Sequence, residues 1–178
     1  MKAGFCLVVM LQLSRHQWMV SAASLPKCVD QDLAITADNN LKLFVDGVQV
    51  TDLQFPDISN KADTILLPAS AQVVAVSGKK AGEHGGLLGS SATFVTDGSW
   101  KCTDRFYDGW QRVQFDDSEW KAAYVVGTYG LKPWQEVEEI RADAFWIWAS
   151  SDGLSSSADQ DAYCRKHLGK QIVLLKLQ

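Results

Sequence analysis

Residues 33–50 read LAITADNNLKLFVDGVQV, and their pattern decides the fold class. Leu41, Leu43 and Val45 are apolar at every second position, which places them on one face of a β-strand. Asp46-Gly47 follows between two apolar runs, and this dipeptide is typical of a two-residue hairpin turn because both of its central residues need a positive φ. The stretch therefore predicts strands at 33–36, 41–45 and 48–50.

Short apolar runs recur along the rest of the chain between turn residues, as in an antiparallel β-sandwich. Residues 73–76 are apolar on both faces and predict a central strand. Residues 78–89 are rich in glycine and predict a loop. Further strands are expected at 92–96, 144–149 and 172–177.

The first 22 residues have the order of a secretory signal peptide. Lys2 precedes an apolar run at residues 5–13, and Val20-Ser-Ala22 supplies small residues for cleavage. We therefore expect a secreted, extracellular protein in which residues 23–178 form a single domain.

Composition and motifs exclude several classes of protein. The chain has 178 residues, of which 47% are hydrophobic, and a formal net charge of −4, whereas a nucleic-acid-binding protein needs a basic face. No apolar run reaches the ~20 residues of a membrane-spanning helix. His84 and His167, the histidines outside the signal segment, lie in no motif that pairs a base with a nucleophile, so we do not expect an enzyme.

Four segments resemble the galactose-binding-like β-sandwich, or jelly-roll, domains that accompany rhamnosidases and other glycoside hydrolases. The first is the hairpin sequence ITADNNLKLFVDG at residues 35–47. The others are the tryptophan-containing series at 96–120, YGLKPW at 129–134, and the pair formed by FWIWA at 145–149 and YCRK at 163–166. The resemblance implies an all-β antiparallel sandwich that acts as a lectin-like carbohydrate-binding module. It also implies a strand at 162–168, although local capping signals favour a helix over 158–168.

Two other functions stay open beside glycan binding. One is a structural or adhesive matrix protein that binds no small ligand, and the other is a detached accessory domain of a glycoside hydrolase. Cys28, Cys102 and Cys164 remain after the signal segment, and this odd number allows one bridge and one thiol for a disulfide-linked dimer. Cys28–Cys164 and Cys102–Cys164 are both possible, and we favour Cys102–Cys164.

Six of the seven tryptophans lie outside the signal segment, and they separate into two groups. Those in apolar strands are expected in the core, namely Trp100, Trp120, Trp146 and Trp148. Trp110 and Trp134 lie among glycine, proline and charged residues, so each indole either offers a flat face to a sugar ring or folds back onto the sandwich.

We predict that a ligand site lies on loops at one end of the sandwich. The residues assigned to it are Trp110, Trp134, Asp38, Asn39, Asp108 and Arg112. Asp38 and Asn39 have an alternative role as caps of a tight turn. No cofactor is expected. The adjacent carboxylates of Asp116 and Asp117 are expected to cap a loop, and the alternative is that they bind a calcium ion.

Overall fold

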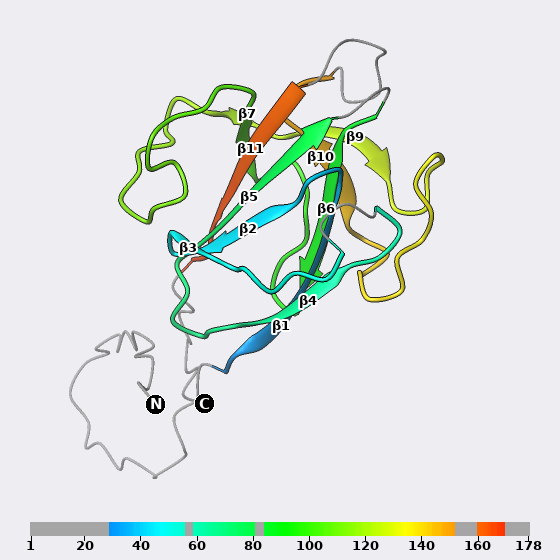
Figure 1. The fold of residues 1–178 in the computed structure, drawn as a ribbon, viewed down its shortest axis with the longest axis horizontal. Helices are drawn as coiled ribbons and strands as arrows, with labels where there is room; N and C mark the ends of the chain where they lie inside the picture. The colour runs from blue at the N-terminus through cyan, green and yellow to red at the C-terminus, as the bar shows by residue number, and fades with distance from the viewer. Residues whose placement is uncertain (1–28, 56–58, 81–83, 152–159, 170–178) are drawn as a thin grey trace, which may run out of the picture.

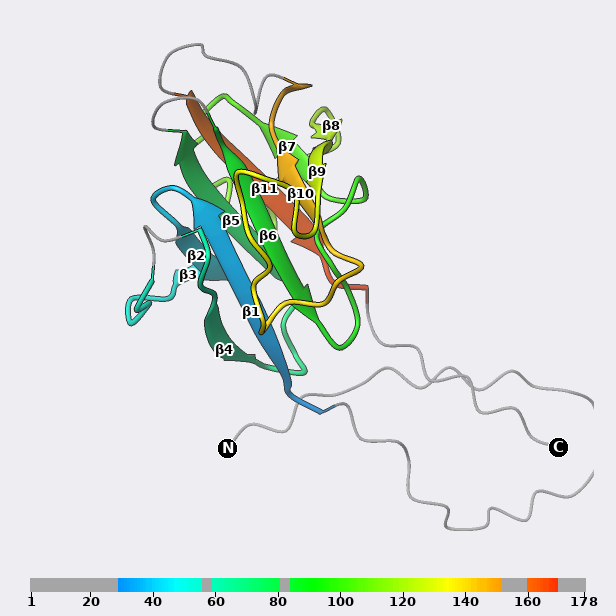
Figure 2. The ribbon, with the colours of Figure 1, turned by 90° about the vertical axis from the view of Figure 1, so that its right-hand side faces the viewer.

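The computed structural model describes residues 29–55, 59–80, 84–151 and 160–169, and they form two antiparallel sheets stacked as a β-sandwich (Figure 1, Figure 2). This architecture confirms the predicted fold class. Within those ranges no α-helix occurs, and no helix is long and apolar enough to cross a membrane.

The two sheets have different strand orders. The five-stranded sheet has the order β4-β1-β6-β10-β9, with β4 Asp63–Leu67, β1 Gln31–Asp38, β6 Gly86–Ser91, β10 Phe145–Trp148 and β9 Tyr124–Thr128. The six-stranded sheet has the order β3-β2-β5-β11-β7-β8, with β3 Val48–Gln49, β2 Lys42–Val45, β5 Val73–Lys80, β11 Gln160–His167, β7 Lys101–Thr103 and β8 Lys121–Ala122.

The main core fills the space between the sheets and draws alternate residues from both. Leu33 and Ile35 of β1 meet Val74 and Val76 of β5 there, and Trp148 packs among them. Burial of side chains of this size contributes roughly 1.5–3 kcal/mol each.

Two long loops cover the outer faces of the sheets (Figure 1). Residues 129–144, yellow in Figure 1, place Trp134, Val137 and Ile140 against the five-stranded sheet. Residues 104–120 place Trp110 and Trp120 against the outer side of β5 in the six-stranded sheet. The loops therefore lie on opposite faces of the sandwich.

Several predictions from the sequence are confirmed. Asp46 and Gly47 have φ values of 51° and 87° and join β2 to β3 as a hairpin. In the segment for which capping signals favour a helix, residues 160–167 form strand β11, paired with β5 along its whole length. All four tryptophans assigned to the core are buried, at 1% exposure for Trp100, 7% for Trp120 and 0% for Trp146 and Trp148.

Two element predictions are wrong, and a third lies outside the described residues. Residues 92–96 form a turn with one isolated bridge, Ser90 to Val95, because the Ser91 Oγ accepts hydrogen bonds from the backbone N–H groups of Thr93 and Phe94. Most of the glycine-rich segment 78–89 belongs to β5 and β6. Residues 172–177 lie outside the described ranges.

The glycine at 86 is explained by packing against tryptophan. A Cβ atom on Gly86 would lie 2.6 Å from Trp146 and 3.0 Å from Trp134, so only glycine lets the strand pass beneath these rings. The glycine that contributed to the loop prediction is therefore explained by side chains that approach a strand closely.

Candidate functional site

Three of the predicted ligand residues meet at one end of the five-stranded sheet. Asp38 ends β1, and its Oδ2 accepts a hydrogen bond of 2.7 Å from Trp134 Nε1, which lies 96 residues further along the chain. The backbone N–H and C=O of Asn39 both bond to Lys79 at 2.7 Å, which fixes the turn after β1. The His84 ring lies edge-on to Trp134, with ring centroids 6.1 Å apart. We call Asp38, Asn39, His84 and Trp134 the Asp38 corner.

Trp134 does not offer a stacking face at this corner. It is 2% exposed and lies parallel to Trp146, with ring centroids 4.4 Å apart. Of the two alternatives for Trp134, folding back onto the sandwich is confirmed and the exposed stacking face is wrong, because its apolar face is covered by Trp146 while its polar N–H edge reaches Asp38. Asp38 and Asn39 are only partly buried, so their polar atoms lie at the edge of this indole pair.

Trp110 is also buried, at 3% exposure. Its ring makes edge contacts with Phe44 and Tyr163, at centroid distances of 5.5 and 5.2 Å, and it stacks on Trp120. For Trp110 too, folding back is the alternative that is confirmed and the exposed stacking face is wrong, since the polar loop around the indole folds it onto the six-stranded sheet.

The six predicted site residues do not form one site. Asp108 and Arg112 are exposed on the loop that carries Trp110, and this loop covers the opposite outer face from the Asp38 corner. Asp38, Asn39 and Trp134 are brought together, while the other three lie on the far sheet.

Asp117, one of the carboxylates considered for calcium, has structural partners instead. Its Oδ2 accepts a hydrogen bond of 2.6 Å from Arg165 Nη1 and lies 3.0 Å from His167 Nε2. Burial lowers the pKa of Arg165, and the nearby Asp117 charge opposes that shift. Asp116 caps the backbone N–H of Ser118, and hydrogen bonds from Ser118 lower the pKa of Asp116. Loop capping and an ion pair therefore account for both carboxylates.

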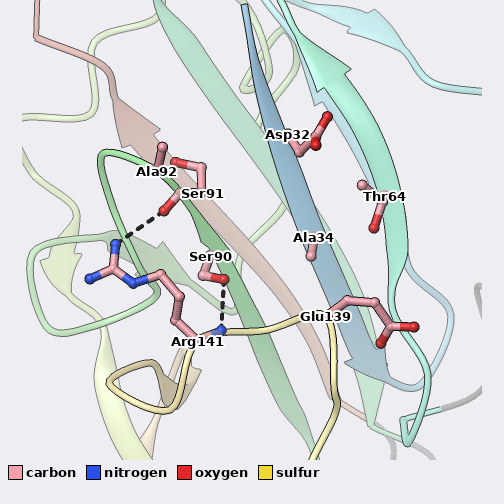
Figure 3. Close-up of a pocket in the computed structure, with 8 residues that line it drawn as sticks. All are labelled: Asp32, Ala34, Thr64, Ser90, Ser91, Ala92, Glu139 and Arg141. Atoms are coloured by element: carbon pink, nitrogen blue, oxygen red, sulfur yellow. Dashed lines mark hydrogen bonds between the residues drawn. The ribbon is translucent and has the colours of Figure 1, made fainter.

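A shallow pocket on the outer face of the five-stranded sheet was not predicted (Figure 3). It measures about 360 Å³ and is lined by Asp32, Ala34, Thr64, Ser90, Ser91, Ala92, Glu139 and Arg141. The Ser90 Oγ accepts a hydrogen bond of 3.0 Å from the Arg141 backbone N–H, which holds loop 129–144 over the sheet. The sequence feature that could have indicated this pocket is a row of small and polar residues on the outer face of the sheet. The row consists of Thr64, Ala34 and Ser90, which are directly paired across β4, β1 and β6.

The predicted Cys102–Cys164 disulfide is confirmed. The two cysteines are directly opposed in the pairing of β7 with β11, with Cα atoms 4.1 Å apart. Two facing strands thus bring the sulfur atoms into bonding range. Cys28 lies outside the described residues, and the bridge that forms is within one chain.

The chain is similar to part of an α-L-rhamnosidase from Streptomyces avermitilis, with 31% identity over 146 residues. The match covers 72% of this chain and 14% of the length of that enzyme. Two solved structures of a lectin from Pleurotus ostreatus also match part of the chain. Its apo form has 20% identity, a TM-score of 0.41 and coverage of 61% of this chain and 35% of the lectin. Its complex with GalNAc has 21% identity, a TM-score of 0.44 and coverage of 65% and 38%.

No family model matches the chain. The rhamnosidase match confirms the resemblance drawn from the sequence motifs, because it joins this chain to a portion of a rhamnosidase and the structure of the chain is a β-sandwich of two antiparallel sheets.

Proposed function

We propose that this chain is a secreted, non-catalytic carbohydrate-binding module whose saccharide contacts lie at the Asp38 corner. Similarity to one portion of a rhamnosidase supports a role in recognising sugars. Secretion rests on the N-terminal pattern of Lys2, the apolar run at 5–13 and the small residues ending at Ala22.

The observation that carries the proposed site is the 2.7 Å hydrogen bond from Trp134 Nε1 to Asp38 Oδ2. A carboxylate held by an indole N–H is fixed in orientation before a ligand arrives, which reduces the ordering cost of binding. Sugar hydroxyl groups donate to such an oxygen, and the side-chain amide of Asn39 and the His84 ring, which lies against Trp134, supply further polar atoms at the corner. The Trp134–Trp146 pair then serves as a rigid support beneath the polar edge.

Replacement of Asp38 tests this site. We expect Asp38→Ala to weaken saccharide binding by about ten- to a hundredfold, because a hydrogen bond to a charged group contributes roughly 1.5–3 kcal/mol. A glycan array run with and without a chelator identifies ligands, and isothermal titration with methyl α-L-rhamnopyranoside, chosen because of the rhamnosidase match, measures affinity. Asp52→Ala is the matched control, since Asp52 is an exposed aspartate.

A second variant separates positioning from packing. Trp134→Phe keeps a buried ring but removes the N–H that holds Asp38, so we expect weaker binding with a smaller loss of stability than Trp134→Ala. Unchanged affinity in both Asp38→Ala and Trp134→Phe would contradict the site. A wild-type chain that binds nothing on the array would contradict the function.

The rhamnosidase match also favours a second function, an accessory domain that acts beside a separate hydrolase. In that case the chain binds the polymer that its partner enzyme cleaves and does not itself release 4-nitrophenol from 4-nitrophenyl α-L-rhamnopyranoside. Turnover of that substrate by the purified chain would contradict both the non-catalytic proposal and the accessory role.

A further inference from the structure

Two aromatic side chains are displayed on the loop between β7 and β8, away from the Asp38 corner. Phe106 is 63% exposed and Tyr107 is 37% exposed, while Trp110 on the same loop is 3% exposed. The loop therefore buries one large aromatic side chain and leaves two others in contact with solvent, and exposed apolar groups of this kind often mark a binding surface. We call Phe106 and Tyr107 the aromatic platform.

Other aromatic side chains pack against the two rings of the aromatic platform. The Phe106 ring contacts Tyr163 edge-on at a centroid distance of 5.7 Å. Tyr107 contacts Phe115 and Trp120, at 6.0 and 5.9 Å. These contacts fix the two rings on the aromatic cluster that covers the six-stranded sheet.

The loop that carries the platform is anchored at its base. Arg165 of β11 donates hydrogen bonds to the backbone carbonyls of Arg112 and Phe115, at 2.9 and 3.1 Å. Cys102 ties β7, which precedes the loop, to Cys164 of β11. The platform therefore sits on a loop that is ordered before a ligand binds, which lowers the entropic cost of binding.

The charged side chains of residues 104–112, on the same loop as the platform, are balanced in sign. Asp104, Arg105, Asp108 and Arg112 are all exposed, and their formal charges sum to zero. Carboxylates accept and guanidinium groups donate hydrogen bonds, so these side chains suit a neutral molecule that carries many hydroxyl groups. A neutral saccharide has such hydroxyl groups at its edge and a C–H face that packs on an aromatic ring.

We infer that the aromatic platform is a second saccharide-binding site, in which the C–H face of a neutral sugar ring stacks on Phe106 and Tyr107. This inference rests on the proposed carbohydrate-binding function. It adds a site on the opposite outer face of the sandwich, one that uses stacking where the Asp38 corner uses a positioned carboxylate.

The test measures saccharide binding at the aromatic platform in a variant whose Asp38 corner lacks the carboxylate. Binding of methyl α-L-rhamnopyranoside to Asp38→Ala is followed by saturation-transfer NMR, and Phe106→Ala is then added. We expect residual binding in Asp38→Ala that weakens by about three- to tenfold in the double variant, in keeping with the usual strength of a ring contact. Phe106→Tyr retains an aromatic ring and is expected to restore binding.

Leu66→Ala in the same Asp38→Ala background is the matched control, because Leu66 is 64% exposed on β4 of the other sheet. Residual binding that Phe106→Ala leaves unchanged, or no residual binding in Asp38→Ala, would overturn the platform while the proposed function stands. A wild-type chain without saccharide binding would overturn both. Loss of self-association in Phe106→Ala by sedimentation, with saccharide binding intact, would identify the platform as a protein contact and overturn the inference.

Discussion

Arg165 carries its positive charge on a side chain that is 1% exposed. Its guanidinium group bonds to Asp117 and to two backbone carbonyls of the loop between β7 and β8, and its charge lies 5.1 Å from the centre of the Phe115 ring. Its Nε has no partner among the described residues. The sequence motif YCRK gave no indication of this role, because the partners lie 48 to 53 residues earlier in the chain.

Removal of this cation is expected to destabilise the protein strongly. Arg165→Met leaves the buried Asp117 carboxylate without its main counter-charge, and breaking such a pair typically costs about 3–5 kcal/mol. Urea unfolding measures the loss, with Arg105→Met as control because Arg105 is an exposed arginine. A loss below about 1 kcal/mol would mean that the surrounding loop rearranges to let water reach Asp117.

Burial of single residues was the least predictable feature of the candidate site. Trp110 and Trp134 have polar neighbours in sequence, and those neighbours form turns, but the indoles themselves face the sheets. A polar loop sequence indicates that the backbone lies at the surface and does not say which side chain points inward. Phe106 and Tyr107 were missed for the converse reason, since apolar residues are expected inside until a structure shows otherwise.

At the scale of elements, the local sequence pattern predicted the strands whose packing in the sandwich agrees with that pattern. The β2–β3 hairpin follows from Asp46-Gly47, and β5 and β10 follow from runs that are apolar on both faces. Strand β6 was not predicted because its sequence, GLLGSS, contains small residues in place of the β-branched residues typical of strands. These small residues make room for large rings on one face of the strand, as the packing of Gly86 against Trp146 shows. Strand β11 was ambiguous locally and is fixed by pairing with β5 and β7.

The disulfide joins two of these elements and its loss is expected to weaken them together. Cys102 and Cys164 are 62 residues apart, and closing a loop of that length restricts the unfolded chain, for which typical stabilisation is about 2–4 kcal/mol. Replacing both cysteines by alanine should lower the midpoint of thermal unfolding, as should reduction of the wild-type chain. If the alanine variant unfolds at the wild-type temperature, strand pairing alone holds β7 against β11.

At the scale of the whole molecule, the sandwich separates two loops that cover opposite outer faces (Figure 1). Its fold class was predictable because alternation and turn residues recur along the chain. The grouping of the site residues was not, because residues 38 and 134 meet across 96 positions while residues 108 and 134 are directed to different sheets. A rigid sandwich therefore keeps the Asp38 corner and the aromatic platform from engaging one small saccharide together.

This separation predicts that the protein cross-links multivalent glycans. Two sites on opposite faces each capture a different carrier, so albumin bearing many α-L-rhamnosyl groups should form a turbid network with the wild-type chain, and free methyl α-L-rhamnopyranoside should dissolve it. Asp38→Ala and Phe106→Ala each retain one site, so both should still bind the carrier in a pull-down but form no network. Leu66→Ala should behave as wild type. Undiminished turbidity in both single-site variants would show that cross-linking comes from association between copies of the chain, and light scattering without the carrier would detect that association directly.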